Sequence, residues 1–229
     1  MPALHVLRVF TAEGAAGEAS GGNRLGVFLD GSSISPSERQ SVAASIGFSE
    51  TVFVDDAARG EVRIFTPAVE LPFAGHPLVG SAWLLARELT AVAFLRPPAG
   101  EVPARAEVES AWIAGRPEWA PPFEWIELAS PREVDALAGA PEGHDLIGAY
   151  AWAGEDSVRA RVFPARLGIE EDEATGAAAV RLGALLGRPL TIHQGRGSVI
   201  EVCPREGGLV EIGGRVTLDE VRPYPAGTT

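Results

Sequence analysis

The sequence predicts an α+β protein made of two similar halves, and three observations support this fold class. A capped helix start, a pair of strands and a glycine-led helix each occur twice along the chain, in the same order. The second set follows the first at an offset of roughly 95 to 100 residues, which is the mark of an internal duplication. A proline-rich stretch at 117–122 separates the sets, so we expect two domains, residues 1–116 and 117–229.

The first repeated element is a short helix that opens with serine, proline and, three residues after the serine, glutamate. Residues 35–38 and 130–133 share this pattern, in which serine caps the helix, proline takes its first position and glutamate completes a capping box. A glycine then favours the end of each helix, Gly47 in the first half and Gly139 in the second.

The second repeated element is a pair of apolar strands joined by a polar turn. The pattern predicts strands at 51–54 and 61–65 in the first half, and at 147–152 and 158–163 in the second. The second strand of each pair has nearly the same sequence in both halves, which strengthens the case for a duplication.

The third repeated element is a helix of small and apolar residues that begins with glycine, at Gly75 and at Gly176. The first amides of a helix have no partner within it, and the helix dipole adds partial positive charge there. Two such helix starts facing across a cleft would bind a carboxylate or an enolate. The alternative is that both are buried helices packed tightly against a sheet.

Composition and charge limit the possible partners. The net charge is −12, which argues against binding to nucleic acid or to an anionic membrane surface. No apolar stretch approaches the roughly 20 residues of a membrane helix, and the N-terminal residues lack a signal-peptide pattern. We therefore expect a cytoplasmic protein.

The absence of lysine excludes several kinds of chemistry. All 19 basic residues are arginine, so Schiff-base enzymes and the lysine-dependent phosphate-binding loop are excluded. Cys203 is the only cysteine, which rules out an internal disulfide and a pair of catalytic thiols. Neither a Gly-x-Ser-x-Gly nor a Gly-x-Gly-x-x-Gly pattern is present, and the four histidines lack metal-ligand spacing. We expect no metal and no organic cofactor.

Three titratable residues are candidates for the chemistry. Glu50 directly precedes a buried strand, where loss of water would raise its pKa toward that of a general base; an exposed loop glutamate is the alternative. His76 lies in the first turn of the glycine-led helix, where it could hold a proton or simply pack. Asp172 belongs to a run of four acids before Gly176, which could equally be a solvated loop.

Several motifs, in the same order along the chain, make this sequence resemble the PhzF-like proteins, relatives of a phenazine-biosynthesis isomerase with the diaminopimelate-epimerase fold. The resemblance runs from about Val6 to about Gly214, and its most specific part is the block from Phe-Thr-Pro to Gly-His-Pro. The motifs are Gly22-Asn23, Ser49-Glu50-Thr51, Arg63 to Pro67 with Glu70 to Pro77, and Gly168 to Asp172 with Ala174 to Gly176.

The resemblance implies a fold, an activity and a site. Each domain would be a curled, mostly antiparallel sheet around a central helix. The protein would be a cofactor-independent isomerase or epimerase that moves a proton between carbons of a small anionic metabolite, and a homodimer is plausible. Glu50 would be the proton shuttle, with His76 and Asp172 beside the substrate. The residues implied in substrate binding are Asn23, Ser49, Gly75, Gly176 and Ala177.

The chain also departs from the family pattern. Ala177 replaces the usual serine, Arg24 stands where proline usually follows Gly-Asn, and the glycine-rich segment 193–198 is short. The missing hydroxyl motivates a second hypothesis, a non-catalytic metabolite-binding protein that retains the cleft. A third, a mainly structural protein, predicts a cleft filled by side chains.

Overall fold

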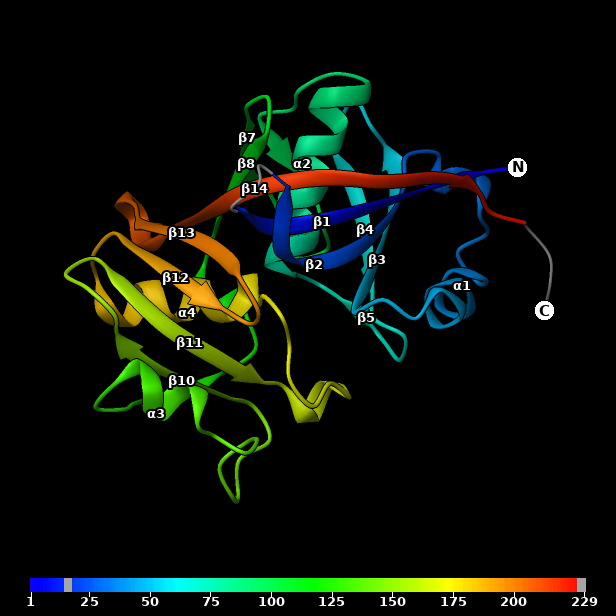
Figure 1. Ribbon diagram of the computed structural model, residues 1–229. Helices are drawn as coiled ribbons and strands as arrows, with labels where there is room; N and C mark the ends of the chain where they lie inside the picture. The colour runs from blue at the N-terminus through cyan, green and yellow to red at the C-terminus, as the bar shows by residue number, and fades with distance from the viewer. Residues whose placement is uncertain (15–17, 226–229) are drawn as a thin grey trace.

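A computed structural model describes residues 1–14 and 18–225 of the chain. It confirms the predicted α+β class, since many strands form one extended sheet and few helices lie against it (Figure 1). The helices are α1 (Arg39–Ile46), α2 (Gly75–Glu88), α3 (Pro131–Asp135) and α4 (Gly176–Leu186). Short 3-10 helices lie at Gly31–Ser33, Pro117–Trp119, Ala165–Leu167 and Glu206–Gly208.

The sheet order follows the halves of the chain. The main path runs β5-β4-β3-β2-β1-β14-β13-β12-β11-β10-β9, and β6, β7 and β8 branch from β14. The strands of the first half are β1 (Ala3–Glu13), β2 (Ala19–Phe28), β3 (Glu50–Asp56), β4 (Glu61–Phe65), β5 (Glu70–Leu71), β6 (Phe94–Leu95), β7 (Val102–Ala106) and β8 (Ser110–Gly115). Those that follow are β9 (Glu124–Glu127), β10 (Ile147–Trp152), β11 (Ser157–Phe163), β12 (Leu190–Gln194), β13 (Ser198–Pro204) and β14 (Val210–Pro223).

The strand pairing repeats between the halves, as the sequence pattern predicts. In the first half β2 pairs in parallel with β3, and β3 pairs antiparallel with β4. In the second half β9 pairs in parallel with β10, and β10 pairs antiparallel with β11. The helices α1 and α3 fill the two parallel crossovers, because parallel neighbours cannot be joined by a tight hairpin.

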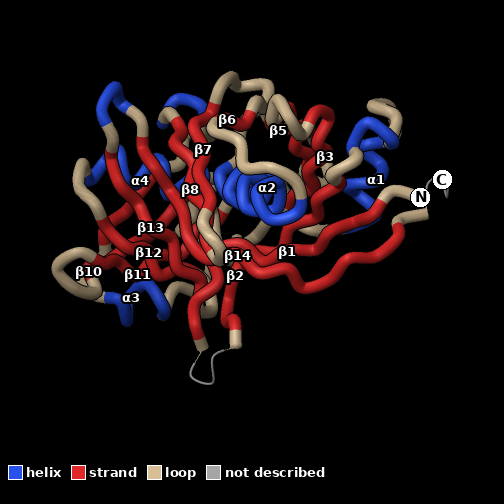
Figure 2. The backbone as a smooth tube through the Cα atoms, turned by 90° about the horizontal axis from the view of Figure 1, so that it is seen from above, coloured by secondary structure: helices blue, strands red, loops and turns tan. Residues whose placement is uncertain are grey.

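Each half wraps its strands around one central helix. Figure 2 looks along α2, with β1, β7 and β8 around it, and these strands all contact the helix. Residues 75–85 of α2 are buried without interruption, so this helix is apolar on all sides instead of showing one polar face. In the second half α4 contacts β13 and β14 in the same way.

β14 belongs to both halves. Val210 to Gly213 pair with β8 on one side and β13 on the other, and the later part of the strand, to Pro223, pairs with β1. The expected second domain, residues 117–229, therefore contributes a strand to the sheet of the first. The boundary at 116 and 117 stays a prediction.

One of the two predicted capping boxes does not form. In the second half the Ser130 hydroxyl accepts the Glu133 amide at 3.4 Å, as expected, although α3 ends at Asp135 and not near Gly139. In the first half residues 36–38 form a turn and α1 begins only at Arg39, so Ser35 does not cap it. Gly47 ends α1 with a φ of 70°, as predicted.

Candidate active site

The starts of α2 and α4 meet at the centre of the molecule. A Cβ atom placed on Gly75 would lie 2.6 Å from the carbonyl carbon of Gly176, and one on Gly176 would lie 2.6 Å from the amide nitrogen of His76. Both distances are shorter than any real contact of that kind, so glycine is required at both positions. The glycines let the two helix backbones touch, which the sequence alone did not reveal.

The first amides of both helices lie outside their own hydrogen-bond ladders. The earliest bonds run from Leu78 to the Ala74 carbonyl and from Ala179 to the Thr175 carbonyl. The amides before these have no acceptor within their helix, which is the usual state of a helix start and gives it partial positive charge. Two positive helix ends are thereby brought together beside Glu50 and His76.

Glu50 and His76 face each other in this region. Glu50 is the first residue of β3 and His76 is the second residue of α2. Oε2 of Glu50 and Nε2 of His76 are 3.4 Å apart, and neither atom has a hydrogen-bond partner among residues 1–14 and 18–225. The Glu50 side chain is 12% exposed and that of His76 3%, so the alternative of an exposed loop glutamate is wrong.

Burial sets the charge of both groups. It raises the pKa of Glu50 to about 7 and lowers the pKa of His76 to about 4. The neutral form of His76 therefore dominates at physiological pH, and its contact with Glu50 is not an ion pair. A carboxyl whose pKa is near 7 can both accept and release a proton at that pH.

Asp172 joins the two halves through a buried hydrogen-bond network. Its Oδ1 accepts from the Asn23 amide at 2.7 Å, and its Oδ2 accepts from the Thr175 hydroxyl at 2.7 Å. Burial, and after it the charge of Glu50, raise the pKa of Asp172 to about 6. The Ser49 hydroxyl donates to Asn23 Oδ1 at 3.1 Å, which extends the network to the residue beside Glu50.

A cavity of about 580 Å³ lies between the two halves, and Asn23 and Asp172 of this network line it. Ser49 also lines it, whereas the other predicted site residues, Glu50, His76, Gly75, Gly176 and Ala177, are not among its lining residues. An open cavity lined by Glu50, His76 and Asp172 together would count against a structural protein, and this cavity meets that condition only at Asp172. The other lining residues are Gly22, Arg24, Gly47, Phe48, Pro67, Ala68, Leu167, Gly168, Ile169, Glu171 and Glu173.

Gln194 is a site residue that the sequence reading missed. Its amide donates to the Asp172 carbonyl at 2.8 Å and to the Thr175 hydroxyl at 3.0 Å, which orients the loop that holds Asp172. A signal was present in the alternation of β12, where Leu190, Ile192 and Gln194 point to the same buried face. A polar side chain on that face must find buried partners.

Ala177 lies at the start of α4 and faces apolar neighbours. Its side chain is 8% exposed and belongs to a buried cluster with Phe123, Leu146 and Val162. The position at which the resemblance implies a hydroxyl is therefore apolar here.

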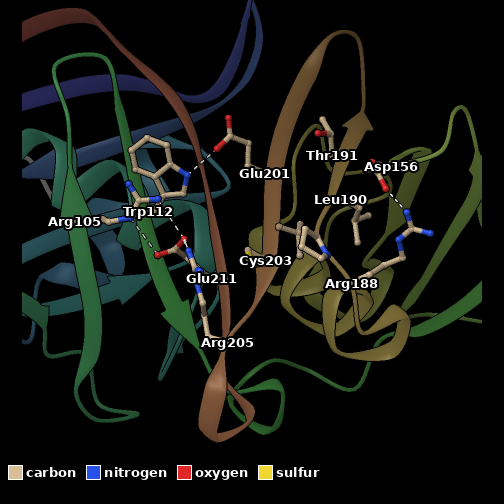
Figure 3. A pocket seen from close by; sticks show the side chains of 12 residues that line it. Arg105, Trp112, Asp156, Arg188, Leu190, Thr191, Glu201, Cys203, Arg205 and Glu211 are labelled. Atoms are coloured by element: carbon tan, nitrogen blue, oxygen red, sulfur yellow. Dashed lines mark hydrogen bonds and ion pairs between the residues drawn. The ribbon is translucent and has the colours of Figure 1, made fainter.

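A second cavity, of about 500 Å³, lies elsewhere in the molecule between β8, β12, β13 and β14 (Figure 3). Arg105 and Arg205 both contact Glu211, and the neutral Trp112 donates to Glu201 at 2.9 Å. None of the predicted site residues lines this cavity.

Within the part of the chain that the structure describes, no helix combines the length and the apolar character needed to cross a bilayer.

Comparison with known proteins identifies the family. Residues 8–157 match the family model described as phenazine biosynthesis-like protein. The chain is 30% identical over 232 residues to a trans-2,3-dihydro-3-hydroxyanthranilate isomerase of Pseudomonas aeruginosa, covering 82% of this chain and 83% of that protein. The enzyme of the same name from Pseudomonas fluorescens is 30% identical over 222 residues, covering 79% and 77%.

Solved structures agree on the fold. A PhzC/PhzF phenazine biosynthesis protein from Clostridium difficile matches 98% of this chain and 100% of its own with a TM-score of 0.78 at 18% identity. A structure described as a proline racemase from Agrobacterium radiobacter, with bound carbonate, matches with a TM-score of 0.65 at 10% identity, covering 99% and 94%. The chain belongs to the phenazine biosynthesis-like, or PhzF, family of isomerases and shares its epimerase-like fold.

Proposed function

We propose that this protein is a cofactor-independent isomerase or epimerase that moves a proton between carbons of a small carboxylate-bearing metabolite, with Glu50 as the proton shuttle. Membership of a family of isomerases supports the general reaction class. The assignment of the proton transfer to Glu50 rests on the site itself.

One observation carries the proposal: Glu50 presents a buried, unpartnered carboxylate oxygen at the joined helix starts. A buried carboxylate oxygen without a hydrogen bond is costly, and a protein that uses it for no purpose would gain stability by replacing it. Its pKa of about 7 means that ionised and protonated forms coexist near neutrality. A group that takes up and returns the same proton needs both forms.

In the proposed reaction Glu50 removes a proton from a substrate carbon, and the electron pair of that C–H bond moves into the conjugated carboxylate system. The first amides of α2 and α4, at Gly75, His76, Gly176 and Ala177, stabilise the negative charge that develops there. Glu50 then returns the proton to another carbon, which restores a neutral framework. Neutral His76 and the Asp172 network hold the Glu50 side chain and tune its pKa.

Solvent deuterium tests the role of Glu50. The protein is incubated in heavy water with trans-2,3-dihydro-3-hydroxyanthranilate, the compound in the name of the Pseudomonas relatives, and with a panel of other small carboxylates. Wild type should introduce deuterium at carbon, and Glu50→Gln should lose at least about 1000-fold in rate because its amide is not a base. The exposed Glu142→Gln serves as the matched control. Equal labelling by wild type and Glu50→Gln would sink the proposal.

Ala177 favours a second candidate, a non-catalytic metabolite-binding protein that retains the cleft. The start of α4 offers an apolar surface where the resemblance implies a hydroxyl, so the site could hold a ligand without completing the reaction. Calorimetry would distinguish the two: tight binding of a carboxylate without turnover or exchange supports the binding protein, and exchange that depends on Glu50 supports the enzyme.

A homodimer, a cytoplasmic location and a reaction without metal stay proposals. Light scattering on the purified protein measures the oligomeric state. Retention of deuterium exchange after treatment with a chelator supports a metal-free reaction, and loss of exchange that is restored by added metal contradicts it.

A further inference from the structure

Arg24 is a cation without an ion-pair partner among the described residues that line the cleft cavity. It lies on β2, next to Asn23, and its guanidinium carbon is 4.4 Å from the centre of the Phe48 ring. It has the only positively charged side chain of that lining, and it forms no ion pair with any carboxylate in the described segments 1–14 and 18–225.

The acidic side chains of the same cavity all have partners. Glu171 pairs with Arg161 at 2.6 Å. Glu173 accepts from the Ser198 hydroxyl at 2.9 Å, and both oxygens of Asp172 accept hydrogen bonds within the network described above. None of these acids forms an ion pair with Arg24, although Asp172 and Glu173 themselves are met by neutral donors and not by a cation.

Arg24 is one of four arginines, with Arg132, Arg181 and Arg196, that form no ion pair among the described residues. The protein has 31 acidic and 19 basic residues, so a carboxylate partner is easily found. Arg8, which lies directly opposite Arg24 in the pairing of β1 with β2, binds Asp219 at 2.8 Å. Phe48 holds the guanidinium by stacking, which leaves its N–H groups available to a ligand.

We propose that Arg24 determines substrate specificity by binding a second carboxylate, so that the preferred substrates are small dicarboxylates. This inference rests on the proposed function, in which the first carboxylate is held at the buried helix starts of Gly75 and Gly176. Arg24 is exposed and lines the cavity, whereas Gly75 and Gly176 are buried and are not among its lining residues, so the two carboxylates would bind at different depths. A guanidinium binds a carboxylate through two parallel N–H···O bonds, and stacking on an aromatic ring fixes its plane.

Calorimetry with matched ligands tests the proposal. Succinate, glutarate and adipate are each titrated against the corresponding monoamide, which has nearly the same shape but one charge fewer. Wild type should bind at least one of the diacids about tenfold more tightly than its monoamide, a preference of the size expected for one charged contact. Arg24→Gln should lose this preference, and Arg24→Lys should keep part of it because it retains the charge without the planar fork.

A control variant tests whether the preference depends on Arg24 in particular, and deuterium exchange tests the isomerase activity separately from ligand binding. Arg132→Gln removes an exposed arginine from α3, outside the cleft, and should leave the preference unchanged. Equal affinity of wild type for every diacid and its monoamide, no binding of any of them at millimolar concentration, or an unchanged preference in Arg24→Gln would overturn the proposal. If the preference is present but no compound exchanges deuterium at carbon, the proposed isomerase activity fails and the role of Arg24 in binding stands.

Discussion

At the scale of single residues, the site is defined by three buried titratable groups that cannot all be charged. Burial raises the pKa of both Glu50 and Asp172, and the charge of Glu50 adds to the rise at Asp172, because neighbouring carboxylates with little water repel each other. His76 stays neutral and provides no compensating positive charge. Near pH 7 the carboxyl pair therefore exchanges one proton readily, which is the property that a proton shuttle requires.

The pH dependence of deuterium exchange should reflect this coupling. The rate should rise with pH through about 7, as Glu50 ionises into the form that can accept a proton. Asp172→Asn removes one negative charge from beside Glu50, so the acidic limb of the pH–rate profile should move to lower pH. Profiles from pH 5 to 9 measure the shift, and an unchanged or higher midpoint in Asp172→Asn would contradict the coupling.

Glu50 should also reduce stability at high pH. Its folded pKa, about 7, lies above the ordinary value of 4.5, so its protonated form is favoured by folding. The contribution of protonated Glu50 to the free energy of unfolding is fully present below about pH 4.5 and is lost as pH rises through 7. Glu50→Gln cannot ionise, so it should be more stable than wild type at pH 8 by about 1–3 kcal/mol, and the difference should shrink toward pH 4.5.

Urea unfolding at the two pH values measures this difference. Glu142→Gln changes an exposed glutamate and should leave stability nearly unaltered at both. A Glu50→Gln protein that is less stable than wild type at pH 8 would mean that the fold accommodates the ionised carboxylate well. That result would contradict the expected cost of ionising Glu50.

At the scale of secondary-structure elements, the contact between α2 and α4 is what creates the site. Gly176→Ala would place a methyl group against backbone atoms of Gly75 and His76, at 2.8 and 2.6 Å, where no flexible side chain can move aside. We expect a loss of about 1–3 kcal/mol in the free energy of unfolding, as for an overpacked core. Gly139→Ala is the matched control, because nothing lies within 4 Å of its new methyl group. Similar unfolding midpoints for the two variants would show that the helix starts can separate without cost.

Sequence patterns predicted which helices and strands form better than they predicted where these elements begin and end. The strands at 61–65 and 147–152 have the predicted bounds, because polar turn residues mark their ends. The strands predicted at 51–54 and 158–163 run instead over Glu50–Asp56 and Ser157–Phe163. The serine-proline capping motif succeeded at Ser130 and failed at Ser35. Arg39 explains the failure, since its buried guanidinium donates to the carbonyls of Gly31 and Ile34 and binds Asp55, which anchors the start of α1. A local motif contains no information about such a distant anchor.

The site was also predictable only in part, because a local motif does not show which distant residues it contacts. Glu50, His76 and Asp172 lie in conspicuous local motifs, and the structure brings the first two within 3.4 Å and links the third to Asn23. Gln194 could be recognised as a site residue only after the fold placed it beside Thr175. The lack of a partner for Arg24 likewise depends on the position of every nearby acid.

At the scale of the whole molecule, the two halves are joined at a point that also supports the site. Ser198 is fully buried; its hydroxyl accepts the Gly22 amide at 2.8 Å and donates to Glu173 at 2.9 Å. This contact fixes β2 immediately before Asn23, which holds Asp172. Ser198→Ala would leave the Gly22 amide without its acceptor.

We expect Ser198→Ala to lower stability by about 1–2 kcal/mol, the cost of a buried unsatisfied group. It should also lower the rate of deuterium exchange, because the position of Asn23 is less well fixed. Ser41→Ala removes an exposed hydroxyl that bonds only to a carbonyl in its own helix region and should change neither quantity. Loss of stability without any change in the rate of deuterium exchange would show that the contact between Ser198 and Gly22 does not affect the proton transfer.

β14 determines whether the halves can unfold separately. It pairs with β13 in the second half and with β8 and β1 in the first, so neither sheet is complete without it. We therefore predict a single unfolding transition, with fluorescence and circular dichroism curves that coincide in urea. In native-state hydrogen exchange, peptides from β3 and β10 should reach the same maximal protection, because both should require global opening. Two separated transitions, with lower protection in one half, would instead mean that residues 1–116 and 117–229 fold as independent domains and that β14 leaves the first sheet at little cost.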